Sequence, residues 1–531
     1  MSPITRRGFI KGAALAPLAL NTLNFQIQTT APDRFDVVVA GAGHNSLVTA
    51  AYLAKAGFRC LVLEGRPTFG GGVKTTELTL RGFRHDVCST AHNSIQENPM
   101  LRDREIDLAQ YGLEYVVPDP VYHMPFSDGS YITQWLDLDR TCSEIAKISR
   151  RDAAAYRRMF YESEKIDPTS KFWQRRSAMS AWDIIRDNIE DDRCRCFMMG
   201  CPPPTEPVND PLTGRGAYSI FGQQRRSRPI PKGGSGALTE ALVKFIEAHD
   251  GVLLVNKPVT QLIVEGGKCT GVECADGSSY RADKAILSTI HIKHLVDMAP
   301  RDLWGQDFID GVQTWKAEVS MFATNYATTE PPIFAVQGGM LPSTNSGMMA
   351  SSERGLQIGF DHARGVANAN EAPLAVHFTT VTDPTRAPAG MHTIKVISWH
   401  PYNLKEGPQH WDVIRTEVAD AHLSYLRRFA RNLTDDKILG RFIQSPLDLD
   451  RMNPHNWHGS CHAGAQSPAQ AGALRPMPGW SGYHMPIPGL YQTGACTAPG
   501  GSVSGVPGRN AAAVMLKDFG TSLEEVAKKK V

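Results

Sequence analysis

Hydrophobic and polar residues near the start of the chain alternate in the order that is typical of a β-turn-α-β unit. Residues 35–40 are a short run rich in valine, residues 41–43 hold two glycines, and residues 45–56 carry alanine and leucine at helical spacing. A second apolar run follows at 58–63 and is predicted to be another strand. The pattern therefore predicts two parallel strands joined through a tight turn and a helix.

Later hydrophobic runs predict more elements of the same kind. A glycine-rich turn within residues 231–242 opens a second predicted helix. Residues 259–264 and 270–275 alternate toward an Asp-Gly turn, which indicates a hairpin. Further strands are predicted at 251–255, 285–288 and 489–493, and the last leads through a glycine-rich stretch, 494–510, into an alanine-rich helix.

The turn after the first predicted strand carries the residues of a dinucleotide site. Gly41 permits the tight turn, and Gly43 lets the backbone approach a pyrophosphate at the start of the helix. Asn45 opens the helix, and Ser46 stands where a third glycine is expected. Because serine adds only a small side chain between helix and strand, the motif is weakened but kept.

An acidic residue ends the second predicted strand. Glu64 follows the turn by roughly 20 residues, the interval at which an acid accepts hydrogen bonds from an adenosine ribose. A carboxylate there disfavours a 2′-phosphate, so NADP is not expected. Arg66, Gly70 and Gly71 complete an E-x-R-x-x-x-G-G pattern, which resembles the extension found in glutathione-reductase-like FAD proteins. The combined pattern favours FAD over NAD.

Three blocks in this order resemble the phytoene-desaturase-like flavoproteins, including the pyridine nucleotide-disulphide oxidoreductase domain-containing branch of the amine-oxidase superfamily. They are residues 41–71, the P-x-G-G-x-G-x-L-x-x-A-L block at 231–242 and the G-x-x-x-x-P-G-G-x-x-x-G block at 494–505. Together they cover nearly the whole chain after its N-terminus. The chain departs from the pattern at Ser46 and at Gly72, where many relatives carry arginine.

The resemblance implies an α/β, glutathione-reductase-like two-dinucleotide FAD fold of Rossmann type with an inserted α+β substrate domain. It implies that Val259 lies beside the adenine and that the 494–503 segment wraps the phosphates and the flavin ring. Within that segment the expected cofactor contacts are Gly494, Ala495, Gly501 and Val503. The implied FAD-binding domain comprises residues 33–91, 228–294 and 455–531, and the implied substrate domain comprises residues 92–227 and 295–454. The FAD is expected to be noncovalent.

The extreme N-terminus resembles a twin-arginine export signal. Arg6 and Arg7 precede Phe9 and an apolar run at 12–20. Residues 1–31 are therefore assigned to an export signal that engages the twin-arginine machinery and directs the protein to the periplasm. The apolar run is too short to span a bilayer, and no later segment approaches the roughly 20 apolar residues required. The alternative is a basic amphipathic tail.

The length and composition are those of a globular protein that is too long for a single hydrophobic core of ordinary size. The chain has 531 residues, of which 42% are hydrophobic, and its net charge is +2. This charge balance argues against nucleic-acid binding. Ten cysteines form no evident disulfide framework, and unpaired thiols are expected.

Few residues stand out as catalytic groups, and none is assigned. His455, His458 and His462 could suggest a metal, but the prolines and glycines around them indicate a loop that lines the flavin pocket, so no metal is expected. His92 and His484 could approach the flavin, although a structural role is the commoner one for such histidines. Cys461 and Cys496 are the candidates for a covalent link to the flavin, but neither fits the known pattern for such a link well.

The sequence thus predicts an FAD-dependent oxidoreductase. It would transfer hydride from an apolar or amphipathic organic substrate to flavin N5 and pass the electrons to oxygen or a quinone. Three alternatives remain open: oxidation of an amine, which predicts an aromatic cage facing the ring; redox-neutral isomerisation, which needs reduced flavin and consumes no oxygen; and a non-catalytic role in which bound FAD is reduced by no small molecule.

Overall fold

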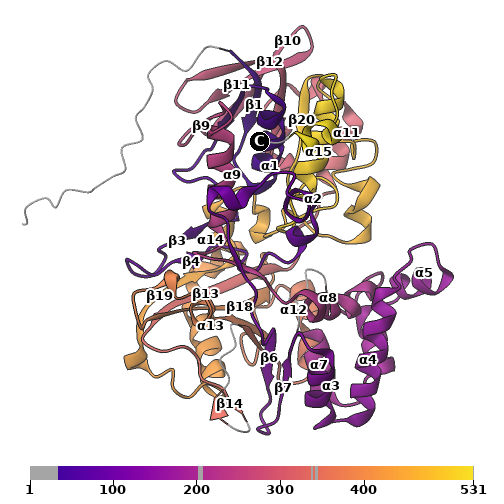
Figure 1. Ribbon diagram of the computed structural model, residues 1–531, viewed down its shortest axis with the longest axis vertical. Coiled ribbons are helices and arrows are strands. Elements are labelled where there is room, and N and C mark those ends of the chain that lie inside the picture. The colour runs from indigo at the N-terminus through magenta and orange to yellow at the C-terminus, as the bar shows by residue number, and fades with distance from the viewer. Residues whose placement is uncertain (1–33, 201–206, 337–338, 341–344, 530–531) are drawn as a thin grey trace, which may run out of the picture. The chain divides into compact units, whose positions relative to one another are not determined.

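The predicted β-turn-α-β unit is present in the structure, a computed structural model that describes residues 34–200, 207–336, 339–340 and 345–529. Strand β1 spans Arg34–Ala40, helix α1 spans His44–Ala56 and strand β2 spans Cys60–Leu63 (Figure 1). The two strands run parallel. The predicted export signal, residues 1–31, lies outside the described residues.

These strands belong to a seven-stranded sheet that also contains the later predicted strands. Its order is β10-β11-β12-β1-β2-β9, and β20 pairs with β12. Strand β12 runs parallel to β1 and β20 and antiparallel to β11. It begins well before the predicted run at 285–288, because its first half pairs with the hairpin strand. The bounds are β9 Val252–Leu254, β10 Val259–Glu265, β11 Lys268–Cys274, β12 Ser279–Ser288 and β20 Leu490–Gln492.

Helix α1 packs between two helices from distant parts of the chain. These are α9, Gly236–Glu247, and α15, Val506–Asp518. The hydroxyl of Thr49 in α1 donates a hydrogen bond to the Gly508 carbonyl of α15 at 2.8 Å. A Cβ atom on Gly508 would lie 2.2 Å from the carbonyl oxygen of Asn45, so the approach requires glycine. The first turns of α1 and α15 therefore meet.

A second seven-stranded sheet is built from other segments of the chain. Its order is β19-β13-β18-β17-β16-β6-β7. Its longest strands are the neighbours β13 and β18, with nine residues each, and every residue of β13 is buried. The bounds are β6 Tyr122–Pro125, β7 Tyr131–Gln134, β13 Ser320–Thr328, β16 Asn345–Met348, β17 Leu374–His377, β18 His392–His400 and β19 Ile438–Gln444.

The remaining helices and short strands connect the two sheets or pack on one of them. The helices are α2 Pro99–Arg102, α3 Leu138–Ala146, α4 Arg150–Glu164, α5 Lys171–Ala178, α6 Ala181–Asn188, α7 Asp192–Met199, α8 Ser219–Arg226, α10 Ile292–Leu295, α11 Gln306–Gln313, α12 Ser352–Arg364, α13 Trp411–Arg427, α14 Pro446–Met452 and α16 Leu523–Lys528. The short strands are β3 Thr75–Thr76, β4 His85–Asp86, β5 Tyr115–Val116, β8 Ile230–Pro231, β14 Ala335–Val336 and β15 Gly339–Met340. Helices α10, α11 and α16 pack on the side of the first sheet and its helices.

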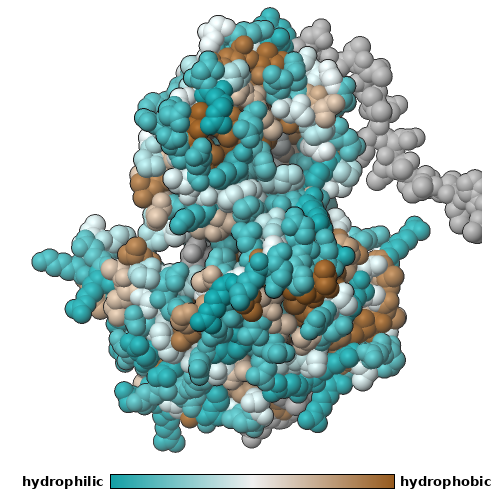
Figure 2. Space-filling model, turned by 180° about the vertical axis from the view of Figure 1, so that it is seen from behind, coloured by the Kyte–Doolittle hydropathy of each residue, from teal (hydrophilic) through white to brown (hydrophobic). Residues whose placement is uncertain are grey.

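All strands of the second sheet come from the two segments assigned to the substrate domain, 92–227 and 295–454. The division into two domains stays a prediction, because residues 34–531 pack as one compact unit. Hydrophilic residues dominate the face seen in Figure 2, with apolar residues in separate clusters. None of the helices in the described part of the chain has the length and apolar character needed to cross a bilayer.

Candidate functional site

The glycine turn and the first residues of α1 form one wall of a large cavity. Gly41 has a φ angle of +99°, and a Cβ atom there would lie 2.6 Å from the Cγ2 atom of Thr289. Only glycine meets both conditions without strain. Asn45 is buried beside this turn, and its Oδ1 atom has no hydrogen-bond partner among the described residues. The start of helix α1 favours a phosphate group, and the Asn45 Oδ1 atom can accept a hydrogen bond from an N–H or O–H of the ligand.

Ser46 supports this wall from behind. Its hydroxyl donates hydrogen bonds to the carbonyl oxygens of Gly41, at 2.6 Å, and Gly43, at 2.9 Å. The side chain is fully buried and does not reach the cavity. Serine at the third glycine position thus ties the turn to the helix, which differs from the cofactor contact predicted for it.

Glu64 lies at the end of β2 and faces the same cavity. Its Oε2 atom accepts a hydrogen bond from the backbone N–H of Ala42 at 3.1 Å. Its Oε1 atom accepts from the backbone N–H and the Nε–H of Arg66, each at 3.1 Å. The Glu64 side chain is 7% exposed, and these bonds fix the orientation of its carboxylate at the cavity wall. This is the position expected for an acid that binds a ribose.

The glycine pair at 70–71 packs against the first turn. The Gly70 N–H donates to the Ala42 carbonyl at 2.8 Å, so Gly70 braces the turn and does not line the cavity. A Cβ atom on Gly71 would lie 3.1 Å from the Cα atom of Gly43. The two glycine segments therefore meet backbone to backbone and leave a flat surface for a ligand.

The C-terminal glycine block closes the cavity from the other side. A Cβ atom on Gly494 would lie 2.5 Å from the Oγ1 atom of Thr289, and one on Gly501 would lie 2.4 Å from the Cβ atom of His462. The carbonyl of Ala495 accepts a hydrogen bond of 2.8 Å from Nε of the buried Arg475. These contacts fix the path of a loop that has no regular secondary structure of its own.

One cavity of about 800 Å³ joins these segments. It is lined by every residue predicted to bind the cofactor except Ser46 and Gly70: Gly41, Gly43, Asn45, Glu64, Arg66, Gly71, Val259, Gly494, Ala495, Gly501 and Val503. Four buried polar atoms of lining residues have no hydrogen-bond partner among the described residues: Asn45 Oδ1, Asn93 Oδ1, Arg228 Nε and His455 Nδ1. Buried polar atoms are rarely left unpaired, so the cavity fits a large polar ligand such as a dinucleotide.

His462 and Glu318 form an ionisable pair at the cavity that the sequence did not indicate. Nδ1 of His462 lies 2.9 Å and 3.0 Å from the two carboxylate oxygens of Glu318, whose side chain is fully buried. Ser460 Oγ and the His462 N–H also donate to Glu318, at 2.8 Å and 3.1 Å. Glu318 lies outside every glycine motif and far from His462 in the sequence, so no pattern could have indicated the contact.

The pairing with Glu318 raises the pKa of His462 above that of an ordinary histidine. Burial disfavours the charged imidazole, but the charge of the Glu318 carboxylate and its hydrogen bond outweigh burial and raise the pKa of His462. His462 lines the cavity with 22% of its side chain exposed. Its Nε2 atom has no hydrogen-bond partner within the described part of the chain, so it can exchange a proton with a molecule in the cavity.

The other candidate histidines have different positions. His92 is fully buried, and its two ring nitrogens contact Tyr115 and Ser235 at 3.0 Å and 2.6 Å, so its role is structural. His484 lies away from the cavity in an ion pair with Asp518. Neither residue lines the cavity, and neither approaches the place predicted for the flavin.

The three histidines considered for a metal do not converge. His455 and His462 line the cavity, whereas His458 stacks on Trp457 with ring centroids 3.9 Å apart. Residues 457–459 form a single turn in which His458 is left-handed. The described residues contain no group of three His, Cys, Asp or Glu side chains that could hold a metal ion.

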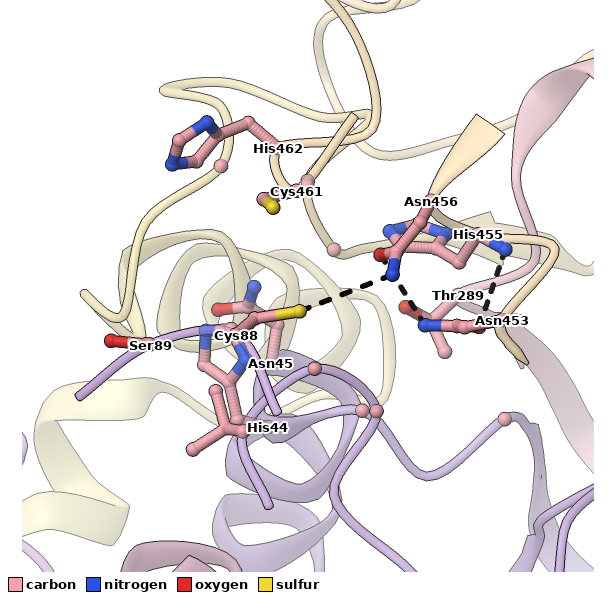
Figure 3. Close-up of a pocket in the computed structure, with 18 of the residues that line it drawn as sticks. His44, Asn45, Cys88, Ser89, Thr289, Asn453, His455, Asn456, Cys461 and His462 are labelled. Atoms are coloured by element: carbon pink, nitrogen blue, oxygen red, sulfur yellow. Dashed lines mark hydrogen bonds between the residues drawn. The ribbon is translucent and has the colours of Figure 1, made fainter. Parts of the chain in front are cut away.

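Of the two cysteines considered for a covalent flavin link, only Cys461 lines the cavity; Cys496 is buried away from it. Cys88, which no motif in the sequence indicated, lines the cavity together with Cys461 (Figure 3). All nine cysteines in the described ranges are free thiols. Noncovalent binding stays a prediction.

Together, the parallel strands β1, β2, β12 and β20, the glycine segments and the acid after β2 define a dinucleotide-binding fold. The chain belongs to the family of flavin-containing amine oxidoreductases, whose model matches residues 47–516. It is therefore an FAD-dependent oxidoreductase, and the predicted family, fold class and enzyme class are confirmed.

Several relatives share nearly the whole chain. A subunit of the limonene dehydrogenase of Castellaniella defragrans is 26% identical, with 92% of this chain and 95% of that protein covered. Pyridine nucleotide-disulfide oxidoreductase domain-containing protein 2 of Mus musculus is 24% identical over 91% of this chain and 94% of its own. The neurosporene-forming phytoene desaturase of Cereibacter sphaeroides is 24% identical over 92% and 95%, respectively.

Solved structures share the fold at lower identity. An oxidoreductase from Methanosarcina mazei superposes with a TM-score of 0.63 at 17% identity, covering 91% of this chain and 99% of its own. Cyclohexylamine oxidase from Brevibacterium oxydans superposes with a TM-score of 0.58 at 15% identity, covering 92% and 100%. These matches establish the architecture.

Proposed function

We propose that the protein dehydrogenates an apolar or amphipathic organic substrate in the part of the cavity that lies against the second sheet. The observation that carries this proposal is the continuity of the cavity. Residues predicted to bind the cofactor share it with Met321, Ile397 and Trp399 from β13 and β18. An apolar wall next to a cofactor suits a substrate with few polar groups.

The proposed cofactor contacts lie in the turn before α1, at Gly71, in the 494–503 loop, and at Glu64, Arg66 and Val259. They would hold FAD without a covalent bond, the acid on the ribose and the glycines along the phosphates. When bound, the flavin would accept hydride at N5, and the electrons would leave to oxygen or a quinone. The protein supplies orientation, exclusion of water and a group that moves a proton.

His462 is the proposed proton acceptor. Dehydrogenation removes a hydride and a proton from the substrate, so a base must stand at the cavity. Glu318 holds Nδ1 of His462 and stabilises the imidazolium that proton transfer creates. A base whose pKa is raised from 6.5 matches an operating pH near neutrality.

The names of two relatives support an apolar substrate, since limonene and phytoene are both hydrocarbons. Amine oxidation receives less support from the cavity. An aromatic cage needs facing rings, and Trp399 is the single Phe, Tyr or Trp among the described residues that line it. The flavin titration described next distinguishes dehydrogenation from isomerisation and from a purely binding role.

The test is an anaerobic absorbance titration of the flavin-loaded protein with panels of terpenes and polyenes, amines, and hydroxylated aromatics. Bleaching of the oxidised-flavin band by the apolar panel supports the proposal, and bleaching only by amines refutes it. Conversion of substrate that requires prior flavin reduction and consumes no oxygen indicates isomerisation. A flavin that no compound reduces indicates a binding role. His462→Gln should slow bleaching, whereas the matched control His484→Gln, remote from the cavity, should not.

We also propose that residues 1–31 direct export to the periplasm. The support is the sequence around Arg6 and Arg7. Cell fractionation of the full chain should place it in the periplasm, and replacing both arginines with lysine should retain it in the cytoplasm. Equal distribution of the two forms would contradict the assignment.

A further inference from the structure

Two cysteines from distant parts of the chain meet at the cavity. Cys88 follows β4, and Cys461 follows the turn at 457–459. Both residues line the cavity and pack against the same apolar cluster, which includes Met321 and Ile397. The sulfur of Cys461 lies 4.0 Å from the sulfur of Met321. The side chains of Cys461 and Cys88 interact electrostatically across this cluster. Figure 3 shows the two side chains projecting from separate segments into the same region.

The sulfur of Cys88 lies next to the surface predicted to hold the flavin dinucleotide. A Cβ atom on Gly72 would stand 3.6 Å from this sulfur. Gly72 directly follows Gly71, which packs on the glycine turn before α1. On the other side, Nδ2 of Asn456 lies 4.0 Å from the Cys88 sulfur (Figure 3). The thiol pair therefore adjoins the cofactor surface.

A buried cation stands beneath Cys88. The ammonium group of Lys395, in β18, donates hydrogen bonds to the carbonyls of Cys88 at 2.6 Å, Asp86 at 3.0 Å and Val87 at 3.2 Å. The interaction with the Cys461 side chain and the charge of Lys395 outweigh burial and lower the pKa of Cys88 to about 6. These groups stabilise a thiolate at Cys88.

The other cysteines in the described part of the chain have the opposite character. Burial raises the pKa of Cys60 to about 12 and the pKa of Cys269 and of Cys496 to about 11. Cys194 and Cys196 are likewise buried with raised pKa values. Such thiols are poor nucleophiles at neutral pH. Cys461 is also held protonated, because its interaction with Cys88 and burial raise its pKa. Thiolate character is therefore concentrated at Cys88, with Cys461 as its protonated neighbour in the cavity.

We propose that Cys88 and Cys461 form a redox-active pair that exchanges two electrons with the flavin. In the direction of disulfide reduction, reduced flavin supplies two electrons and the S–S bond breaks. Cys88 leaves as a thiolate, Cys461 takes one proton, and the flavin becomes oxidised. The reverse reaction forms the bond and returns both electrons and the proton, so the exchange needs no further reactant. This proposal rests on a flavin in the cavity and is independent of the substrate.

The first experiment examines the pair without flavin. The full chain, stripped of cofactor, is incubated with oxidised glutathione, alkylated without reduction and digested for peptide mass analysis. Wild type and the control Cys142→Ser, which changes a buried thiol elsewhere, should both yield a peptide linked through Cys88 and Cys461. Cys88→Ser and Cys461→Ser should not. Absence of the linked peptide in wild type, or indiscriminate pairing with other cysteines, would overturn the proposal.

The second experiment measures exchange with the flavin. The flavin-loaded protein, pre-oxidised and freed of oxidant, is titrated anaerobically with dithionite. Wild type and Cys142→Ser should take up twice as many electrons per flavin as Cys88→Ser or Cys461→Ser. Equal uptake by all four proteins, or a covalent bond between flavin and either cysteine, would refute the exchange. Neither readout uses a substrate, so failure of the proposed dehydrogenase activity would leave both results interpretable.

Discussion

Replacing Gly41 by alanine tests whether the glycine turn is held by a contact with Thr289. Gly41 has φ of +99°, and Gly57, which ends α1, has φ of +100°. Both positions therefore have a positive φ that an alanine adopts only with strain. They differ in space: a Cβ atom on Gly41 would lie 2.6 Å from Cγ2 of Thr289, whereas nothing lies within 4 Å of one on Gly57.

The expected loss of stability in Gly41→Ala is the sum of the backbone strain and the steric overlap with Thr289. Alanine at this φ should cost about 1–3 kcal/mol at either site. At Gly41 the Cβ atom must also displace Thr289, and forcing an extra carbon into packed surroundings costs typically about 1–3 kcal/mol more. Because the displaced turn lines the cavity, part of this cost falls on cofactor binding, where about 1.4 kcal/mol is a tenfold change in affinity. Flavin affinity should fall about tenfold or more in Gly41→Ala.

The assay combines chemical denaturation of the cofactor-free protein with titration of FAD by fluorescence. Gly57→Ala, which lies outside the cavity, should lower stability and leave FAD affinity near the wild-type value. Thr289→Ser removes the Cγ2 atom, so the double variant Gly41→Ala with Thr289→Ser should recover most of the lost affinity. If both single glycine variants bind FAD equally well, or if Thr289→Ser restores nothing, the contact does not shape the site.

Two further predictions concern buried charges. Substrate-driven flavin reduction should speed up as pH rises through the raised pKa of His462, and Glu318→Gln should move that limb to lower pH; an unmoved limb would exclude His462 as the base. In stability, this pair contributes fully below the unfolded-state value of about 6.5 and loses its contribution as pH rises through the folded-state pKa. Burial alone would raise the pKa of Asp86, but the charge and hydrogen bond of Arg386 outweigh burial and lower it. The Asp86–Arg386 pair therefore contributes its full stability above the unfolded-state pKa of about 4, and this contribution is lost as pH falls through the folded-state pKa. Arg386→Met leaves Asp86 buried and unpaired and should cost about 3–5 kcal/mol in chemical denaturation, whereas the half-exposed control Arg451→Met should cost little; equal losses would contradict this.

The local elements could be predicted because their signals are contained in short stretches of sequence. The valine run before Gly41, the alanine-rich helix after it and Glu64 at the end of the next strand all formed as expected. The loop at 455–462 could be predicted because Gly459 and the nearby proline break a helix. Ser46 was only half understood, since its hydroxyl bonds backward to the turn and away from the cavity.

The sequence by itself determined the cofactor class and the turns that hold it, because a glycine at positive φ and an acid at a fixed interval act within one β-turn-α-β unit. The tertiary structure alone decided which other groups reach the cavity. Glu318 meets His462 and Thr289 meets Gly41 across long stretches of chain. Cys461 and Cys88 likewise come from distant segments to the same cavity and apolar cluster. Such contacts depend on the order of strands in the sheets and on the paths of the loops, and no short sequence pattern encodes either. For that reason the cofactor could be read from the sequence, whereas the groups proposed to carry protons and electrons could be found only in the fold.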